Sequence, residues 1–224
     1  MLSEEKSAFI RFMIDAGALS FGCFVTKSGR NSPYFINTGE YKTGEQLSKL
    51  GDFYAELIKN SLDIANEEFT VLFGPAYKGI PLVTAAASKL AEQGLNYKVS
   101  FDRKERKGHG EGSMILGYLP NNGERIAIVE DVTTAGTSVR EVMTLLTELK
   151  IDAKVVALYI SVDRMEKGTC ALTATKQIEQ EYGIKVFSIA KAIDIIDYLE
   201  NCSSIENAKE YAKNMRKYLA EYGV

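Results

Sequence analysis

The sequence has few cysteines, a single histidine and no excess of positive charge. Its three cysteines, Cys23, Cys170 and Cys202, show no CxxC spacing and no pairing pattern. We therefore expect structural thiols in a reducing compartment. With 27 Lys and Arg against 30 Asp and Glu, the net charge is −3. This balance argues against a general polyanion-binding surface, so any affinity for phosphate must come from local clusters.

Long apolar runs, repeats and Pro/Gly/Ser-rich linkers are also missing. The N-terminal stretch MLSEEKSAFIRFMIDAG carries charges among its apolar positions, so we expect neither a secretory signal nor a membrane span. At 224 residues, with 46% hydrophobic and 25% charged residues, the chain fits one large globular domain. We expect a cytoplasmic protein that binds neither membranes nor nucleic acid.

What is present is an alternation of strand and helix patterns. Apolar residues at helical spacing predict helices over 3–16 and 43–61, and turn residues at 28–31 predict a hairpin over 20–37. The elements expected further along are strands near 69–73, 97–101, 125–130, 153–161 and 185–189, an apolar stretch at 114–119, and helices near 79–93, 138–149, 171–182 and from 191 onward. This order predicts an α/β fold with a mainly parallel sheet and helices on both faces. Ligands bind such sheets at the carboxyl ends of strands, which directs attention to the loops after 73, 101 and 130.

The stretch IAIVEDVTTAGTS (126–138) joins an apolar strand to a predicted helix through two adjacent carboxylates. Small hydroxyl residues and Gly136 before a helix suit a phosphate, because helix N-termini present unpaired amides and the positive end of a dipole. Ordinary N-capping by Thr137 or Ser138 is the alternative. Glu130 and Asp131 would repel a bare phosphate, and they favour a ligand such as ribose 5-phosphate, whose hydroxyls lie near its phosphate. The P-loop pattern GxxxxGK[ST] is absent.

The same stretch resembles the 5-phosphoribosyl-1-diphosphate-binding signature of the type I phosphoribosyltransferases. The resemblance implies their fold: a mainly parallel central sheet flanked by helices, a small hood mainly from residues 1–40, and a mobile catalytic loop, within a single domain of residues 1–224. It also implies that Glu130 and Asp131 hold the ribose hydroxyls and face the cationic centre. The residues implied to bind the rest of the donor here are Val132, Thr133, Thr134, Ala135, Gly136, Thr137 and Ser138.

The stretch LFGPAYKGIPL (72–82) places a lysine beside a glycine at a predicted helix start. A lysine in that position can meet a diphosphate, although a surface lysine in a turn is an equally ordinary explanation. The stretch resembles the diphosphate-binding loop of the orotate phosphoribosyltransferases. This resemblance implies that Tyr77 and Lys78 contact the donor.

The stretch DRKERKGHGEGS (102–113) concentrates positive charge in an otherwise acidic chain. Three glycines are typical of a mobile lid, and the one-sided charge favours an anionic partner over the alternative of a solvated hairpin. GHGEG precedes a strand and not a helix, which excludes a dinucleotide fingerprint. The run resembles the catalytic loop of the same family, which closes over the active site of the neighbouring subunit. The residues implied to contact the diphosphate are Arg103, Lys104, Lys107 and His109.

The stretch TKSGRNSPYFIN (26–37) matches the orotate-specific segment of that family. The match implies that Lys27 reaches the donor or the reacting edge and that Phe35 stacks on the pyrimidine. The family often has a second aromatic residue at the position of Ile36. With isoleucine there, the resemblance implies a backbone contact with orotate and no stacking. Without the resemblance, a plain hairpin with a core phenylalanine is the simpler interpretation.

The stretch ISVDRMEKG (160–168) ends a predicted strand in Asp163 and Arg164. A planar guanidinium suits a carboxylate, and the resemblance implies that Arg164 contacts orotate with the assistance of Thr134. A surface ion pair between Asp163 and Arg164 is the alternative.

Together these stretches imply the reaction of the orotate phosphoribosyltransferases, in which orotate and 5-phosphoribosyl-1-diphosphate give orotidine 5'-phosphate and diphosphate during UMP biosynthesis. Mg²⁺ is implied, held mainly through the substrate with no direct protein ligand, and so is a homodimer that shares the lid. Lys104, His109 and Asp131 are the candidates for catalysis, and the sequence does not rank them.

Two other functions stay open at this point. One is a phosphoribosyltransferase for another nucleobase, against which Phe35, Arg164 and the basic lid argue. The other is a non-catalytic regulator that senses the donor. The acidic net charge and the absence of a basic helix-turn-helix segment before residue 20 argue against the regulator.

Overall fold

The computed structural model describes residues 2–26, 29–65, 68–105, 114–133, 136–168, 171–202 and 204–224. Its helices are α1 (Glu4–Asp15), η1 (Thr38–Glu40, a 3-10 turn), α2 (Gly44–Ala65), α3 (Gly79–Glu92), α4 (Thr137–Glu148), α5 (Ala174–Tyr182), α6 (Ala192–Asn201) and α7 (Ala208–Tyr222). Its strands are β1 (Leu19–Val25), β2 (Asn31–Ile36), β3 (Val71–Gly74), β4 (Lys98–Asp102), β5 (Ile115–Gly117), β6 (Arg125–Glu130), β7 (Lys154–Asp163) and β8 (Lys185–Lys191). The predicted order of elements is confirmed. In the described part of the chain, no helix is both long and apolar enough to cross a bilayer.

Six strands form the central sheet in the order β5-β4-β3-β6-β7-β8. All neighbouring strands run parallel except β4 and β5, which are antiparallel. The side chains of β6 are buried from Ile126 to Val129, and those of β7 from Val155 to Val162. Continuous burial of this kind follows when helices cover both faces of a parallel sheet. The prediction of a mainly parallel α/β sheet is therefore confirmed.

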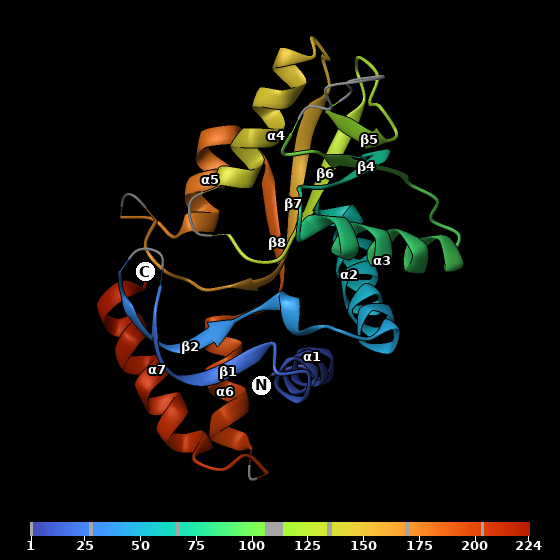
Figure 1. Cartoon of the computed structure of the whole chain (residues 1–224). Helices are drawn as coiled ribbons and strands as arrows, with labels where there is room; N and C mark the ends of the chain where they lie inside the picture. Colours follow the sequence, from blue (N-terminus) through green and yellow to red (C-terminus); the bar gives the residue numbers. More distant parts are fainter. Residues whose placement is uncertain are drawn as a thin grey trace.

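Helices cover the two faces of the sheet in pairs, α2 and α3 on one face and α4 and α5 on the other (Figure 1). Val139, Val142 and Leu146 recur at helical spacing along α4 and pack against Ile126 and Ile128 of β6. The alternating side chains of β6 thus serve both cores, because successive residues of a strand point to opposite faces. Packing on both faces fixes the position of β6 in the sheet, and with it the position of the residues that follow its last residue.

A second, smaller sheet pairs β1 with β2 in an antiparallel hairpin, as predicted. The helices α1, α6 and α7 surround this hairpin in the lower part of Figure 1, and α7 packs against both β2 and α6. The chain end therefore returns to the N-terminal 40 residues. Cys23 in β1 and Cys202 after α6 carry free thiols, while Cys170 lies outside the described residues.

The order of strands reverses between β3 and β6. From β3 the chain moves outward to β4, and it then returns to form β6 on the opposite side of β3. The helix after β3 packs on one face and the helix after β6 on the other. In open parallel sheets, this reversal at the carboxyl ends of the strands is where ligands bind.

Candidate active site

Asp131 follows the last residue of β6, and its carboxylate accepts hydrogen bonds from three parts of the described chain. The residue is 6% exposed. Oδ1 accepts the backbone N–H of Val132 at 2.7 Å, and Oδ2 accepts both the Thr38 hydroxyl and the Lys78 ammonium, each at 3.0 Å. The structure thus joins the loop after β3, the turn after β2 and the end of β6 at one carboxylate.

Glu130 has a different environment from its neighbour. Burial is the largest cause that raises the pKa of Glu130 well above the usual carboxylate range, and the negative charge of Asp131 is the next. A hydrogen bond from the Ser138 hydroxyl acts in the opposite direction. The two adjacent acids are therefore unequal: Asp131 is paired with a cation, and Glu130 holds a proton to higher pH than an exposed glutamate does.

The backbone at the end of β6 is fixed by residues that no sequence motif indicated. The Tyr54 hydroxyl of α2 donates to the carbonyl of Glu130 at 2.6 Å. The hydroxyl and the amide of Ser161 in β7 both donate to the carbonyl of Asp131. Together with Thr38, these two residues set the position of the acidic pair. Their role could not be predicted because their contacts join distant parts of the chain.

Gly136 occupies the N-cap position of α4 with φ of +66°. A β-carbon at this residue would lie 2.8 Å from Cγ1 of Ile178, so both the conformation and the space favour glycine. The Gly136 amide donates to the Thr133 hydroxyl at 3.2 Å. The alternative of N-capping by Thr137 or Ser138 is wrong, because both residues lie inside the helix. Thr134 and Ala135 are outside the described residues.

The loop after β3 approaches β6 closely because two of its residues lack side chains. A β-carbon on Gly79 would lie 3.0 Å from the carbonyl oxygen of Val129, and one on Gly74 would collide with the carbonyl of Gly79. This packing brings Lys78 into its contact with Asp131. Tyr77, in contrast, is 70% exposed. Lys78 is an exposed lysine in a turn, as the plainer interpretation held, and it also pairs with a buried acid.

The segment after β4 carries Arg103 and Lys104. Lys104 Nζ lies 2.6 Å from Oε2 of Glu141 on α4 and 3.7 Å from Oδ2 of Asp102. The hydrogen bond with Glu141 is the main cause that raises the pKa of Lys104. Nε of Arg103 is buried and has no hydrogen-bond partner in the described part of the structure. Lys107 and His109 fall outside the described residues.

Asp102 connects this segment to the loop after β3. The residue is 8% exposed, and Oδ1 accepts the backbone N–H of Ala76. The peptide bond between Ala76 and Tyr77 is cis. The two loops predicted to meet the diphosphate are therefore held together by a buried carboxylate.

Successive side chains of β2 point to opposite sides, which separates Phe35 from its neighbours. Phe35 is 43% exposed and stacks on Phe24, with 5.4 Å between ring centroids, whereas Tyr34 and Ile36 are buried. The alternative of a core phenylalanine is therefore wrong for Phe35. The side chain of Ile36 belongs to the core and is unavailable for stacking, so its predicted backbone contact stays a prediction. Lys27 lies outside the described residues.

Arg164 is 8% exposed and pairs with Glu166, not with Asp163. Nε of Arg164 donates to Oε1 of Glu166 at 2.7 Å, and its guanidinium lies 4.3 Å from the ring centroid of Tyr34. Asp163 instead accepts the amide of Met165 and the hydroxyl of Thr175. The surface ion pair considered from the sequence is therefore wrong on both counts, because the arginine is buried and its partner differs.

Residues 37–169 match the model of the phosphoribosyl transferase domain. The orotate phosphoribosyltransferases of Clostridium beijerinckii and Clostridium botulinum are 44% and 43% identical to the chain, and each alignment covers 99% of the chain and 99% of the relative. The crystal structure of the orotate phosphoribosyltransferase of Francisella tularensis is 35% identical, with a TM-score of 0.82, and the match covers 97% of this chain and 100% of that one.

Proposed function

We propose that this chain, which belongs to the orotate phosphoribosyltransferase family, transfers the 5-phosphoribosyl group from 5-phosphoribosyl-1-diphosphate to orotate. The products are orotidine 5'-phosphate and diphosphate, as in pyrimidine biosynthesis. The fold is that of the type I phosphoribosyltransferases, as the sequence predicted. Sequence identity of 44% and 43% to two orotate phosphoribosyltransferases, over 99% of the chain, also favours orotate over another nucleobase and catalysis over donor sensing.

The contact between Lys78 and Asp131 is the observation that supports the donor site best. A diphosphate and a ribose are adjacent in the donor, and the residues proposed to bind them meet at 3.0 Å. On this basis Glu130 and Asp131 take the ribose hydroxyls, and the loop from Val132 to Ser138 takes the 5-phosphate. The diphosphate is bound by basic and aromatic side chains of three segments: Lys27, Tyr77, Lys78, Arg103, Lys104, Lys107 and His109.

The charges of this arrangement suit the transition state of the transfer. As the bond from the anomeric carbon to the diphosphate oxygen breaks, positive charge grows on the ribose ring and negative charge on the leaving oxygens. The carboxylates at the end of β6 stabilise the positive charge on the ribose ring. The basic side chains after β3 and β4 stabilise the negative charge on the leaving oxygens. Both carboxylate oxygens of Asp131 already accept hydrogen bonds, which suits an electrostatic role for this residue.

The acceptor side would be built from β2 and the end of β7. Phe35 offers an exposed aromatic face for the pyrimidine, and Arg164 offers a guanidinium for the carboxylate. Thr134 and the backbone at Ile36 complete the proposed orotate contacts. Exposure of Phe35 beside buried neighbours supports this assignment, because a ring that stacks only on the protein would be covered.

Mg²⁺ fits the donor set as an ion that the substrate carries. Among the described residues, no group of three or more His, Cys, Asp or Glu side chains is arranged to hold a metal. The acidic pair Glu130 and Asp131 would reach the ion through the ribose hydroxyls. When bound, the ion would neutralise charge on the diphosphate oxygens, and such oxygen-rich ligands suit Mg²⁺.

We also infer a single structural unit over residues 1–224 that pairs into a homodimer. One core cluster joins residues of α1, β1 and β2 to α2, α3, α6 and α7, which supports a single unit. The homodimer follows from the family resemblance, in which the basic loop serves the neighbouring site. Mixing two variants inactivated in different parts of the site, such as Lys104→Ala and Asp131→Asn, would recover activity if sites are shared. No recovery would indicate self-contained subunits.

The proposed reaction is tested by following the absorbance of orotate in the presence of the donor and Mg²⁺. The same assay is then repeated with adenine, hypoxanthine and uracil. We expect turnover with orotate alone. Turnover with a purine and none with orotate would replace the proposal with another phosphoribosyltransferase, and donor binding without any turnover would favour the regulator.

A further inference from the structure

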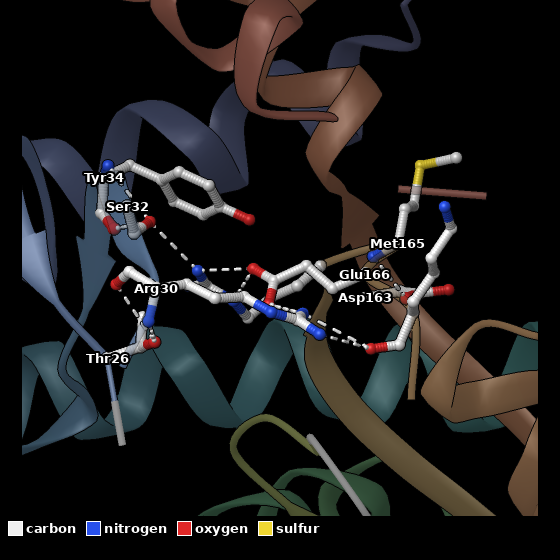
Figure 2. Close-up of polar contacts among 9 residues, drawn as sticks. Thr26, Arg30, Ser32, Tyr34, Asp163, Met165 and Glu166 are labelled. Carbon is white, nitrogen blue, oxygen red and sulfur yellow. Dashed lines mark hydrogen bonds and ion pairs between the residues drawn. The ribbon is translucent and has the colours of Figure 1, made fainter. Parts of the chain in front are cut away.

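Glu166 lies three residues beyond the end of β7 and faces two arginines from different parts of the chain. Figure 2 shows Glu166 and Asp163 beside Thr26, Arg30, Ser32 and Tyr34 of the N-terminal hairpin. Oε1 of Glu166 lies 2.6 Å from a terminal nitrogen of Arg164, and Oε2 lies 3.3 Å from one of Arg30. One carboxylate therefore holds the two guanidiniums together.

The contacts of Arg164 with the described residues of this network involve only Nε and Nη2 of its guanidinium. Nε donates to Oε1 of Glu166, Nη2 forms an ion pair with the same oxygen at 2.6 Å, and Nη2 donates to the Ser32 hydroxyl at 3.1 Å. The Ser32 hydroxyl is itself anchored, since it donates to the carbonyl of Tyr34 at 2.7 Å. Within the described part of the structure, Nη1 of Arg164 enters no hydrogen bond of this network. It is thus the nitrogen that remains to donate to a ligand.

The second arginine connects this network to the hairpin turn. Arg30 donates to the carbonyl of Lys167 as well as to Glu166, and its guanidinium lies 5.2 Å from the ring centroid of Tyr222. The carbonyl of Arg30 accepts the amide of Thr26, which closes the turn at the tip of the hairpin. Glu166 therefore fixes the relative position of the hairpin tip and the end of β7.

The charges and burial of the cluster indicate what it is prepared to bind. Two guanidiniums face one carboxylate, so the ion pairs leave one positive charge to be balanced. The side chains of Arg164 and Glu166 are only 10% and 11% exposed, which limits screening by solvent. A buried, oriented cation with an open nitrogen suits an acceptor that carries a carboxylate.

We propose that Glu166 is a positioning residue for recognition of the acceptor carboxylate. It holds the Nε and Nη2 side of Arg164 and keeps Nη1 directed at the acceptor, and through Arg30 it fixes the hairpin that carries Phe35. This inference rests on the proposed function, because the carboxylate is that of orotate. It assigns Glu166 no contact with the substrate.

The test compares Glu166→Gln with Glu200→Gln. Glu200 also holds an arginine with both oxygens, at 2.6 and 2.8 Å from Arg216, but on the surface. In Glu166→Gln, the amide presents a donor to one of the two guanidiniums, so Arg164 loses its fixed orientation. We expect kcat/KM for orotate to fall about tenfold or more, because small misplacements of a binding group reduce productive geometry. The dissociation constant of 5-phosphoribosyl-1-diphosphate, measured without acceptor, should change less than about twofold. Glu200→Gln should alter neither quantity.

A double-mutant cycle separates positioning from a general structural role. If Glu166 acts through Arg164, then Glu166→Gln has a much smaller effect on kcat/KM for orotate in an Arg164→Ala background than in the unmodified protein, and the contact with Arg30 accounts for what remains. Additive losses, an equal weakening of donor binding, or an unchanged kcat/KM for orotate in the single variant would each overturn the inference. Absence of orotate turnover in the unmodified protein would instead overturn the proposed function, so the two failures are distinguishable.

Discussion

Lys104 Nζ lies 2.6 Å from Oε2 of Glu141, on the helix that begins at the proposed phosphate loop. The side chains are 37% and 51% exposed, so the pair contributes little to stability, about 0–1 kcal/mol. The same ammonium is a candidate for the departing diphosphate. The contact therefore places a carboxylate in competition with the substrate for Lys104.

Removal of the lysine should affect the reaction and spare the fold. Lys104→Ala is expected to lower kcat about 100-fold or more, as loss of one group that stabilises developing negative charge does. Thermal unfolding should be nearly unchanged. The companion variant Glu141→Gln removes the nearer of the two carboxylates that contact the ammonium. It should lower KM for the donor about two- to fivefold, which corresponds to the energy of an exposed ion pair. Near-normal kcat in Lys104→Ala would mean that the basic segment has been misassigned.

Thr38→Val should reduce activity although no motif indicated this residue. The substitution removes the hydroxyl that donates to Oδ2 of Asp131 at 3.0 Å while keeping the shape of the side chain. A hydrogen bond to a charged group is worth about 1.5–3 kcal/mol, so we expect kcat/KM for the donor to fall by at least about tenfold. The matched control is Thr84→Val, because Thr84 donates its hydroxyl to a carbonyl within α3, on the exposed side of that helix. Equal activities of the two variants would remove Thr38 from the site.

Gly136→Ala should destabilise the protein by more than the strain of a left-handed backbone conformation alone would. Gly183 serves as the control, since its φ of +65° is almost the same but a β-carbon added there would have no atom within 4 Å. Gly183→Ala should cost about 1–2 kcal/mol, the usual penalty for a left-handed alanine. Gly136→Ala adds the collision with Ile178, so we expect a larger loss in urea unfolding and a raised KM for the donor. Similar losses in both variants would show that the loop tolerates a side chain.

The sequence was sufficient to predict the elements because each depends on local periodicity. The apolar spacing of α2 and α4 and the short apolar runs of β3 and β6 are such local signals. The rule that strand ends gather at one edge directed attention to the loops after β3 and β6, and in the structure Lys78 and Asp131 of these two segments are in contact. The fold class and the location of the candidate site followed from these two steps.

The partners of the site residues could not be predicted in the same way. Thr38 meets Asp131 across 93 positions of sequence, and Arg30 meets Glu166 across 136. Contacts of this kind depend on how the hairpin packs against the large sheet, for which a single sequence carries no periodic signal. The exposure of Phe35 and burial of Arg164 depend on the same packing, which is why their plainer interpretations were wrong.

The protonation of Glu130 should make stability depend on pH. Because the folded-state pKa of Glu130 is raised, its contribution to stability is full below the pKa of the unfolded state and is lost as pH rises through the folded-state pKa. Glu130→Gln removes this titration. We expect the variant to gain stability relative to the unmodified protein by about 1–3 kcal/mol between about pH 5 and pH 8, as measured by urea unfolding. A difference that is constant across this range would contradict the assignment.

Two neighbours of Glu130 should change that pH dependence in opposite directions. Asp131 raises the pKa of Glu130 and the Ser138 hydroxyl lowers it, while burial is the largest cause. Asp131→Asn should therefore reduce the loss of stability between about pH 5 and pH 8 without abolishing it, because burial of Glu130 remains. Ser138→Ala should increase that loss, since the ionised carboxylate gives up a donor. If both variants shifted the pH dependence in the same direction, a group other than Glu130 would be responsible for it.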